Sequence, residues 1–508
     1  MHRLVRVSSG VVLALGLTSG TAMAELTAQQ VWTSLESTFK GFGYSVTATE
    51  IPDDDGLTVS DIDLRYSGAE DDSRIRITMD GIDLIEAADG SVLMTLPAAI
   101  PISISATPEG DAPVTMMLGY GTDAMETVVS GEPGNMTYAF VANQLTMSLI
   151  DLAIDGKEIS REDARFDLVF DDVTGKIVAD TRDGVQIVQD TRAGSASYDL
   201  AFTNPDGGEA MILAGAMEAF AAESDSTLPE GFDSSDPQSL AAGGFAADGS
   251  VSYEDGQSQF AFTEDNGTTA GTTGSASVAL DFSMDDTALS YSLGATGQTV
   301  SMSGPEMPVP LDFKMAETAL NLTAPIAEAD TPQDMAMGIA LRGFELSDVI
   351  WNIIDPETIL PRDAATIALD LTGKVTPGVN LFDPEAMARV EETRVAPGEL
   401  NALTLNDLTV ELAGATMGGT GSFTFDNEDM ETFGGFPRPT GSVELTFDGV
   451  NALIDKLISM GLVTEEDAMG ARMMMSMFAV PGDGEDSLKS SLTINEQGHV
   501  LANGMRIQ

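Results

Sequence analysis

Four methionines and one phenylalanine lie close together near the C-terminal end of a chain that contains no cysteine. They are Met469, Met473, Met474, Met477 and Phe478. On a helix of 3.6 residues per turn, Met469, Met473 and Met477 share one stripe, with the other two beside it. Thioethers can fill a core, form an adaptable apolar surface or bind copper(I). Three interpretations stay open: packing of a helix on a sheet, which is the simplest, a surface for a lipid or partner, and a copper site.

The chain has few groups for nucleophilic catalysis or for a zinc site. It contains two histidines, of which His2 lies at the N-terminus and His499 near the C-terminus. Ser-His-Asp and Cys-His mechanisms need a histidine base beside a nucleophile. Structural zinc sites need several Cys or His ligands. We therefore expect no catalytic residues, no cofactor and no bound metal.

Acidic residues are the one abundant reactive type. The chain has 81 Asp and Glu against 23 Lys and Arg, which gives a formal net charge of −58. A surface of this charge repels phosphates, so nucleic acids are excluded as partners. Carboxylates could bind calcium or form the acid and base of a hydrolase, although no run has the spacing of an EF-hand loop and no pair stands out. A calcium- or copper-binding envelope protein and a carboxylate-based hydrolase remain the alternatives.

The first 24 residues have the three parts of a secretory signal peptide. Arg3 and Arg6 precede the apolar run 11–17, and Ala22-Met23-Ala24 ends the segment. This pattern predicts cleavage before Glu25 and export, with the periplasm as destination and secretion as the alternative. The apolar run is shorter than the roughly 20 residues that cross a bilayer, so we expect no stable membrane anchor.

Alternation of apolar and polar residues recurs through most of the rest of the chain. Clear examples are residues 75–79, 277–284, 367–371, 408–412 and 443–447. A period of two is typical of strands with one buried face. Short Gly, Asn and Asp turns between them favour antiparallel hairpins. We predict a mainly β, α+β fold: a large, curved, antiparallel β-sheet meander, groove-like, with flanking helices.

Five regions change to a helical period. They are residues 27–42, 209–223, 346–360, 384–393 and a C-terminal helix pair at 449–480. In the pair, Gly461 suits a left-handed end to the first helix. Thr464, with Asp467 three residues later, resembles the capping box of the second.

A segment rich in Ser, Asp, Gly and Pro divides the chain. It covers residues 225–248 and shows little periodicity. We interpret it as linker-like, between an N-terminal β-rich half at 25–224 and a C-terminal β-rich half at 249–508 that contains the helix pair.

Several stretches of the C-terminal half resemble a known bacterial family. They are WNIIDP at 351–356, LFDP at 381–384, GGTGSF at 418–423, GSVEL at 441–445 and GVNALIDKL at 449–457. These stretches resemble the exported bacterial family called domain of unknown function 2125 (DUF2125). The resemblance implies an exported, β-rich protein and brings no catalytic or binding residue with it.

In texture the chain is also similar to AsmA-like periplasmic proteins, whose antiparallel strands form a long apolar groove implicated in lipid movement. It differs from them because it has no retained N-terminal membrane helix. Long strands with one apolar face need a non-aqueous neighbour, and helices that cover only part of the face leave a groove. We therefore expect a non-catalytic periplasmic protein that binds a lipid-like apolar ligand or an envelope protein partner.

Overall fold

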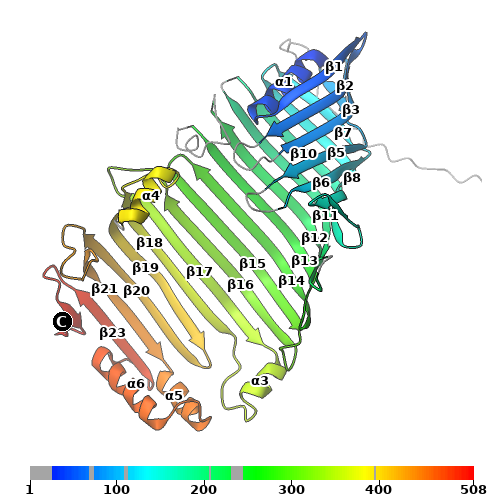
Figure 1. Ribbon diagram of the computed structural model, residues 1–508. Coiled ribbons are helices and arrows are strands. Elements are labelled where there is room, and N and C mark those ends of the chain that lie inside the picture. The colour runs from blue at the N-terminus through cyan, green and yellow to red at the C-terminus, as the bar shows by residue number, and fades with distance from the viewer. Residues whose placement is uncertain are drawn as a thin grey trace, which may run out of the picture.

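The computed structural model describes residues 26–67, 74–107, 112–182, 184–204, 207–229, 244–393 and 396–508. The predicted signal peptide lies outside the described residues. The described residues form one antiparallel sheet of 25 strands with helices along its margins (Figure 1). The predicted class, a large curved antiparallel sheet with flanking helices, is confirmed.

Nine strands make up the N-terminal part of the sheet. They are β1 (Ser45–Asp53), β2 (Gly56–Ser67), β3 (Arg74–Glu86), β4 (Val92–Thr95), β5 (Ala99–Ala106), β6 (Val114–Asp123), β7 (Glu126–Glu132), β8 (Asn135–Ile154) and β9 (Lys157–Ile159). One end of β3 connects to β8 through β5 and β6, and its other end connects to β8 through β4 and β7. Two short strand pairs therefore lie end to end between β3 and β8.

Beyond β8 the sheet is a simple meander in which nearly every strand pairs with the next one. Its strands are β10 (Ala164–Asp180), β11 (Val185–Thr203), β12 (Ala210–Leu228), β13 (Ala246–Glu264), β14 (Gly267–Asp285), β15 (Ala288–Ser303), β16 (Leu311–Pro325), β17 (Gln333–Leu346), β18 (Ala365–Pro377), β19 (Gly398–Leu412), β20 (Ala415–Asp426), β21 (Arg438–Asp448), β22 (Val480–Pro481), β23 (Ser487–Ile494), β24 (Val500–Ala502) and β25 (Met505–Arg506). The long strands β10–β17 form the broad middle of the molecule (Figure 1). All five alternating stretches singled out in the sequence lie in strands of this sheet.

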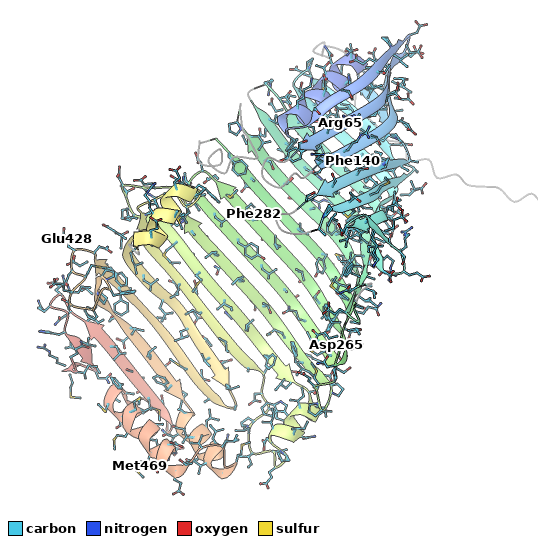
Figure 2. All side chains as sticks on the ribbon, in the orientation of Figure 1. Arg65, Phe140, Asp265, Phe282, Glu428 and Met469 are labelled. Carbon is cyan, nitrogen blue, oxygen red and sulfur yellow. The ribbon has the colours of Figure 1, made fainter. Side chains whose placement is uncertain are left out.

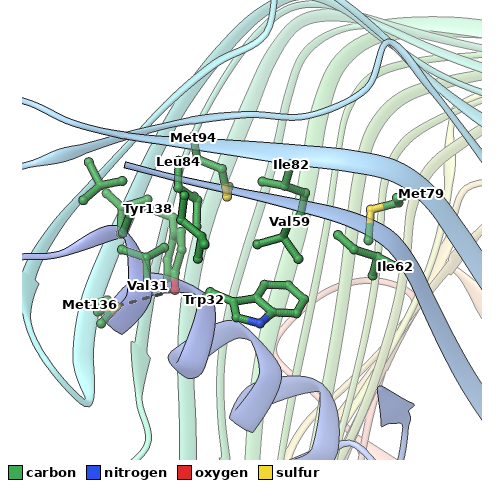
Figure 3. Close-up of a cluster of buried hydrophobic side chains, with 14 of the residues drawn as sticks. Val31, Trp32, Val59, Ile62, Met79, Ile82, Leu84, Met94, Met136 and Tyr138 are labelled. Atoms are coloured by element: carbon green, nitrogen blue, oxygen red, sulfur yellow. Dashed lines mark hydrogen bonds between the residues drawn. The ribbon is translucent and has the colours of Figure 1, made fainter. Parts of the chain in front are cut away.

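The helix α1 (Ala28–Gly41) packs on the N-terminal part of the sheet and forms the main core with it. A capping box between Thr27 and Gln30 begins the helix. Trp32 is only 2% exposed and its Nε1 donates a hydrogen bond to Oε1 of Glu50 on β1, at 3.1 Å. Figure 3 shows Val31 and Trp32 facing side chains of the neighbouring strands. The strand residues buried in this core include Val59, Ile62, Ile82, Leu84, Val129 and Met136.

Four further helices lie at the margins of the C-terminal part of the sheet. They are α3 (Asp348–Ile354), α4 (Pro384–Thr393), α5 (Val450–Ser459) and α6 (Glu465–Phe478). The helix at 384–393 and the C-terminal pair are confirmed, as are the left-handed Gly461 and the Thr464 cap, whose Oγ1 accepts from the Asp467 N–H. The helix predicted at 346–360 is shorter, because Asp355 precedes Pro356 and a residue before proline disfavours helical backbone.

The helix predicted at residues 209–223 is wrong, because this segment belongs to the strand β12. Its Ala- and Met-rich composition favours a helix, but ladders with β11 and β13 along both edges override that preference. The apparent helical period has a separate cause. Ala219 has a left-handed φ of 49°, and this irregularity separates the apolar residues Met217 and Phe220 by three positions.

Ala219 belongs to a line of irregular residues that crosses the sheet from β10 to β17. Left-handed backbone occurs along it at Asp172, Ala219, Asp255, Gly297 and Gly343. The ring of Tyr253 lies over Gly256, where a built Cβ would be 2.5 Å from it. Each irregular residue adds one position to the alternation, so the side chains before and after it that share a face are three positions apart instead of two. The same face of the sheet therefore stays apolar along the whole length of these strands.

The linker-like segment at 225–248 is the connection between two neighbouring strands. Its first residues belong to β12 and its last to β13, and these strands pair directly, for example through Asp225 and Asp248. Residues 230–243 lie outside the described residues. The two β-rich halves thus belong to one continuous sheet.

Candidate functional site

A row of aliphatic side chains runs across seven neighbouring strands on one face of the sheet. Each residue lies directly opposite the next in the strand register, so all of them point to the same side. We call this row the apolar strip; it consists of Val251, Leu280, Leu293, Leu320, Ile339, Leu369 and Leu408. Six strand spacings of about 4.8 Å make the strip about 29 Å long.

Parallel rows widen the strip on both sides. One row begins at Phe282 and the other row begins at Val278. Both residues are two positions from Leu280 in β14 and therefore point to the same face as Leu280. The first row consists of Phe282, Tyr291, Leu322, Met337, Leu371 and Leu405. The second consists of Val278, Ala295, Thr318, Leu341, Ile367 and Val410. Together the three rows form a broad, almost wholly apolar face.

The described helices leave this face uncovered. Leu320, Leu322, Met337 and Ile339 lie on central strands, yet they are 37%, 40%, 41% and 39% exposed. Among the described residues after 200, the buried hydrophobic ones are Leu228, Ile326 and alanines. In Figure 2, Phe282 lies in the broad middle of the sheet, away from the helices at its margins. Large apolar side chains on a central sheet normally lie against a second layer, which these residues lack.

The opposite face of the same strands is polar. The residues next to the apolar strip in sequence point there, as Asp281, Ser292, Asn321, Asp370 and Asp407 do. A hollow of about 660 Å³ on this side is lined by side chains such as those of Asp225, Asp248 and Asp281. Because carboxylates are spread over the polar face, the apolar face is the candidate site for an apolar ligand.

A family model matches residues 236–507, which is more than half of the chain. Its description is an uncharacterized protein conserved in bacteria, DUF2125. The chain belongs to the DUF2125 family. The strands that carry the apolar strip all lie within the matched residues of this DUF2125 protein. No curated protein and no solved structure matches the chain, so the AsmA-like similarity has no support from these comparisons.

The methionines singled out in the sequence do not lie on the apolar strip. In this DUF2125 chain, Met469, Met473, Met474 and Met477 are 58–67% exposed on α6, and Phe478 is partly buried. The packing of these four methionines against the sheet, which was the simplest interpretation of the sequence, is therefore wrong. The helix instead turns Ala468 and Arg472 inward.

The physical reason is an ion pair that helical periodicity does not reveal. Arg472 donates hydrogen bonds to Asp455 at 2.6 Å and to Oδ1 of Asn451 at 3.2 Å, both on α5. These contacts fix the rotation of α6 about its axis. A charged side chain thus faces the neighbouring helix, and the stripe of methionines faces solvent.

Carboxyl groups with shifted pKa values lie away from the apolar strip. Hydrogen bonds from Arg65 and Arg76 hold the pKa of Asp63 far below its ordinary value. Within the described residues, every carboxyl with a shifted pKa is shifted downward. A general acid in a hydrolase requires the opposite, a raised pKa. The described part of the chain also contains no group of three or more His, Cys, Asp or Glu arranged to hold a metal ion.

The sequence pattern predicted strands with one apolar face but did not identify the apolar strip as a site. The strands of Leu280, Leu369 and Leu408 are among the alternating stretches singled out in the sequence. The available indication was the small number of helices relative to strands, which are too few to cover so many apolar faces. None of the described helices is long and apolar enough to cross a membrane.

Proposed function

We propose that this DUF2125 protein is an exported, non-catalytic carrier that binds a lipid-like apolar ligand on the apolar strip. The observation that carries the proposal is the exposure of Leu320 and Ile339 in the middle of a continuous aliphatic row. Leaving this surface in water costs about 25 cal/mol per Å² of apolar area, which a bound hydrocarbon chain would recover. The N-terminal 24 residues support export to the periplasm.

The chemistry of the face favours a hydrocarbon chain over a folded protein partner. Protein interfaces are centred on aromatic and arginine side chains that bind in pockets. The three rows contain one phenylalanine and one tyrosine, Phe282 and Tyr291, and no charged side chain. A strip about 29 Å long and without directional hydrogen-bonding groups suits an extended, flexible acyl chain.

Lipid extraction and a probe titration test the proposal together. The purified mature chain would be extracted with organic solvent, and the extract analysed by mass spectrometry for amphiphiles. The delipidated protein would then be titrated with cis-parinaric acid, whose fluorescence rises in an apolar environment. We expect a co-purified lipid or saturable probe binding; finding neither would refute a carrier role.

A further inference from the structure

Three of the described helices lie at one margin of the sheet. α3 follows the end of β17, and α5 and α6 follow the end of β21. The hairpin between β19 and β20 turns at the same margin, between these helices. Figure 1 shows α3, α5 and α6 along this edge, with α4 at the opposite one. We call this edge the helical margin.

Most of the highly exposed large apolar side chains in the described part of the chain lie at the helical margin. Among the described residues, nine large apolar side chains are 56% or more exposed, and seven of them lie here. They are Ile353 of α3, Leu412 of the hairpin, Leu462 between α5 and α6, and the four methionines Met469, Met473, Met474 and Met477. The other two, Phe436 and Met505, lie elsewhere. A concentration of this kind marks an interaction surface.

Three basic side chains at the helical margin are paired locally. Arg362 pairs with Asp348 at 3.0 Å, and Arg472 pairs with Asp455 at 2.6 Å. Lys489 pairs with Asp483 beside them. The margin therefore offers apolar side chains with few uncompensated basic groups, and it has no basic cluster that would attract an anionic surface.

The net charge of the whole chain limits which partners can bind at the helical margin. At a formal charge of −58, two copies of the chain repel each other and an anionic membrane repels the protein. A zwitterionic bilayer has no net charge, so it does not repel the protein electrostatically. The seven exposed side chains include no aromatic or arginine residue, the types that most often anchor a protein interface, and apolar side chains such as leucine can insert at the boundary between head groups and acyl chains.

We propose that the helical margin docks the protein on the surface of a zwitterionic phospholipid bilayer. The inference deepens the proposed carrier function, since the margin adjoins the strand ends of the apolar face. Ile367, in the row beside the apolar strip, is 51% exposed near the start of β18, and the neighbouring strand β19 ends at Leu412. A lipid chain could pass from the bilayer to the strip along these apolar side chains.

Vesicle flotation tests the docking. The mature chain would be mixed with phosphatidylcholine vesicles and separated on a sucrose gradient. The test variant is Met473→Gln with Met477→Gln, which keeps side-chain length and helix propensity while removing apolar surface. We expect the wild type to float with the vesicles and the test variant to bind about tenfold more weakly. Adding anionic phosphatidylglycerol at low salt is expected to weaken wild-type binding.

A matched control uses two exposed methionines away from the helical margin. Met430→Gln with Met505→Gln is expected to float like the wild type, and Met473→Leu with Met477→Leu should also retain binding, which would exclude a role of sulfur. Absence of wild-type flotation, or equal loss in the test and control pairs, would overturn the proposal. So would a wild-type dimer, seen by sedimentation velocity, that the test pair abolishes.

The parinaric acid titration separates the two proposals. Normal probe binding without flotation would refute docking and leave the carrier function standing. Flotation without probe binding or co-purified lipid would refute the carrier function alone.

Discussion

Leu320 on β16 lies directly opposite Ile339 on β17, and each side chain keeps more than a third of its surface exposed. Both strands are paired along both edges, so these residues are not at a frayed border of the sheet. Their exposure means that the described part of the chain places no second layer above the middle of the sheet. A missing layer over aliphatic side chains is what a carrier of apolar molecules requires.

Replacing these two residues tests the binding face directly. Leu320→Thr with Ile339→Thr places β-branched, strand-compatible side chains at both positions while removing apolar area. We expect the affinity for cis-parinaric acid to fall by about tenfold or more, because each lost side chain would contribute about 1–2 kcal/mol of contact with the ligand. The melting temperature should change little, since the side chains are already partly in water.

The matched control is Ile212→Thr. Ile212 is 44% exposed on β12. Its neighbour Leu213 lies opposite Phe260 and points to the apolar face, so Ile212 points to the opposite, polar face. Probe affinity should equal that of the wild type. If this control weakens binding as much as the test pair does, the ligand does not sit on the apolar strip.

The line of irregular residues across the sheet predicts a stability effect at Gly343. Its φ is 67°, and a Cβ built there would lie 2.6 Å from the Cβ of Ala316 on the neighbouring strand. Gly343→Ala should lower the free energy of unfolding by about 2 kcal/mol, from left-handed strain and the close contact. Urea unfolding measures this change.

Gly294→Ala is the comparison for that experiment. A Cβ at Gly294 on β15 meets nothing within 4 Å. Because alanine restricts the unfolded chain, this substitution should leave the stability unchanged or raise it by up to about 1 kcal/mol. Equal destabilisation by both substitutions would show that the backbone geometry at Gly343 is not the cause.

Trp32 is expected to contribute more to stability than Trp351. Trp32→Phe removes the hydrogen bond to Glu50 and leaves space in the main core, at a cost of about 1–3 kcal/mol. Trp351 lies on α3, where Arg362 stands over its ring at 5.8 Å from the centroid. Trp351→Phe should cost less than about 1 kcal/mol. Thermal unfolding of both variants measures the two losses of stability. A larger loss for Trp351→Phe than for Trp32→Phe would contradict the placement of the main core at α1.

The Asp486 carboxylate caps the N-terminus of α5, so we expect the stability of the fold to depend on pH through this residue. The N-cap residue Gly449 provides no side chain, and the Asp486 carboxylate accepts the backbone N–H groups of Asn451 and Ala452 instead. Burial raises the pKa of Asp486, but these hydrogen bonds outweigh burial and bring the pKa below its ordinary value. Asp486→Asn should therefore lower stability at pH 7 by about 1 kcal/mol.

The effect should disappear in acid. A carboxyl whose pKa is lower in the folded state stabilises the fold above its unfolded pKa of about 3.9, and this contribution is lost as the pH falls through the folded value. The stability difference between Asp486→Asn and the wild type should thus narrow below about pH 4. Urea unfolding at pH 7, 5 and 3 measures it, and a difference in the free energy of unfolding that is as large at pH 3 as at pH 7 would rule out the charged cap.

Several features were predictable from the sequence because they depend on neighbours a few residues apart. The alternation around Leu369 and Leu408 predicted strands with one apolar face, and the Thr464 cap and Gly461 predicted the ends of the C-terminal helices. Residues 209–223 were mispredicted because the left-handed backbone at Ala219 shifts the alternation and imitates a helical period. Nothing local distinguishes that irregularity from a helix turn.

The sequence by itself determined the β-rich class, the one-sided apolar character of the strands and the scarcity of histidine and cysteine, since these follow from composition and short-range periodicity. Only the tertiary structure decided which apolar surfaces stay open. The contact of Arg472 with α5 turned the methionines outward, and the marginal positions of the helices left Leu320 and Ile339 uncovered. Both outcomes depend on contacts between elements distant along the chain, which local patterns do not encode.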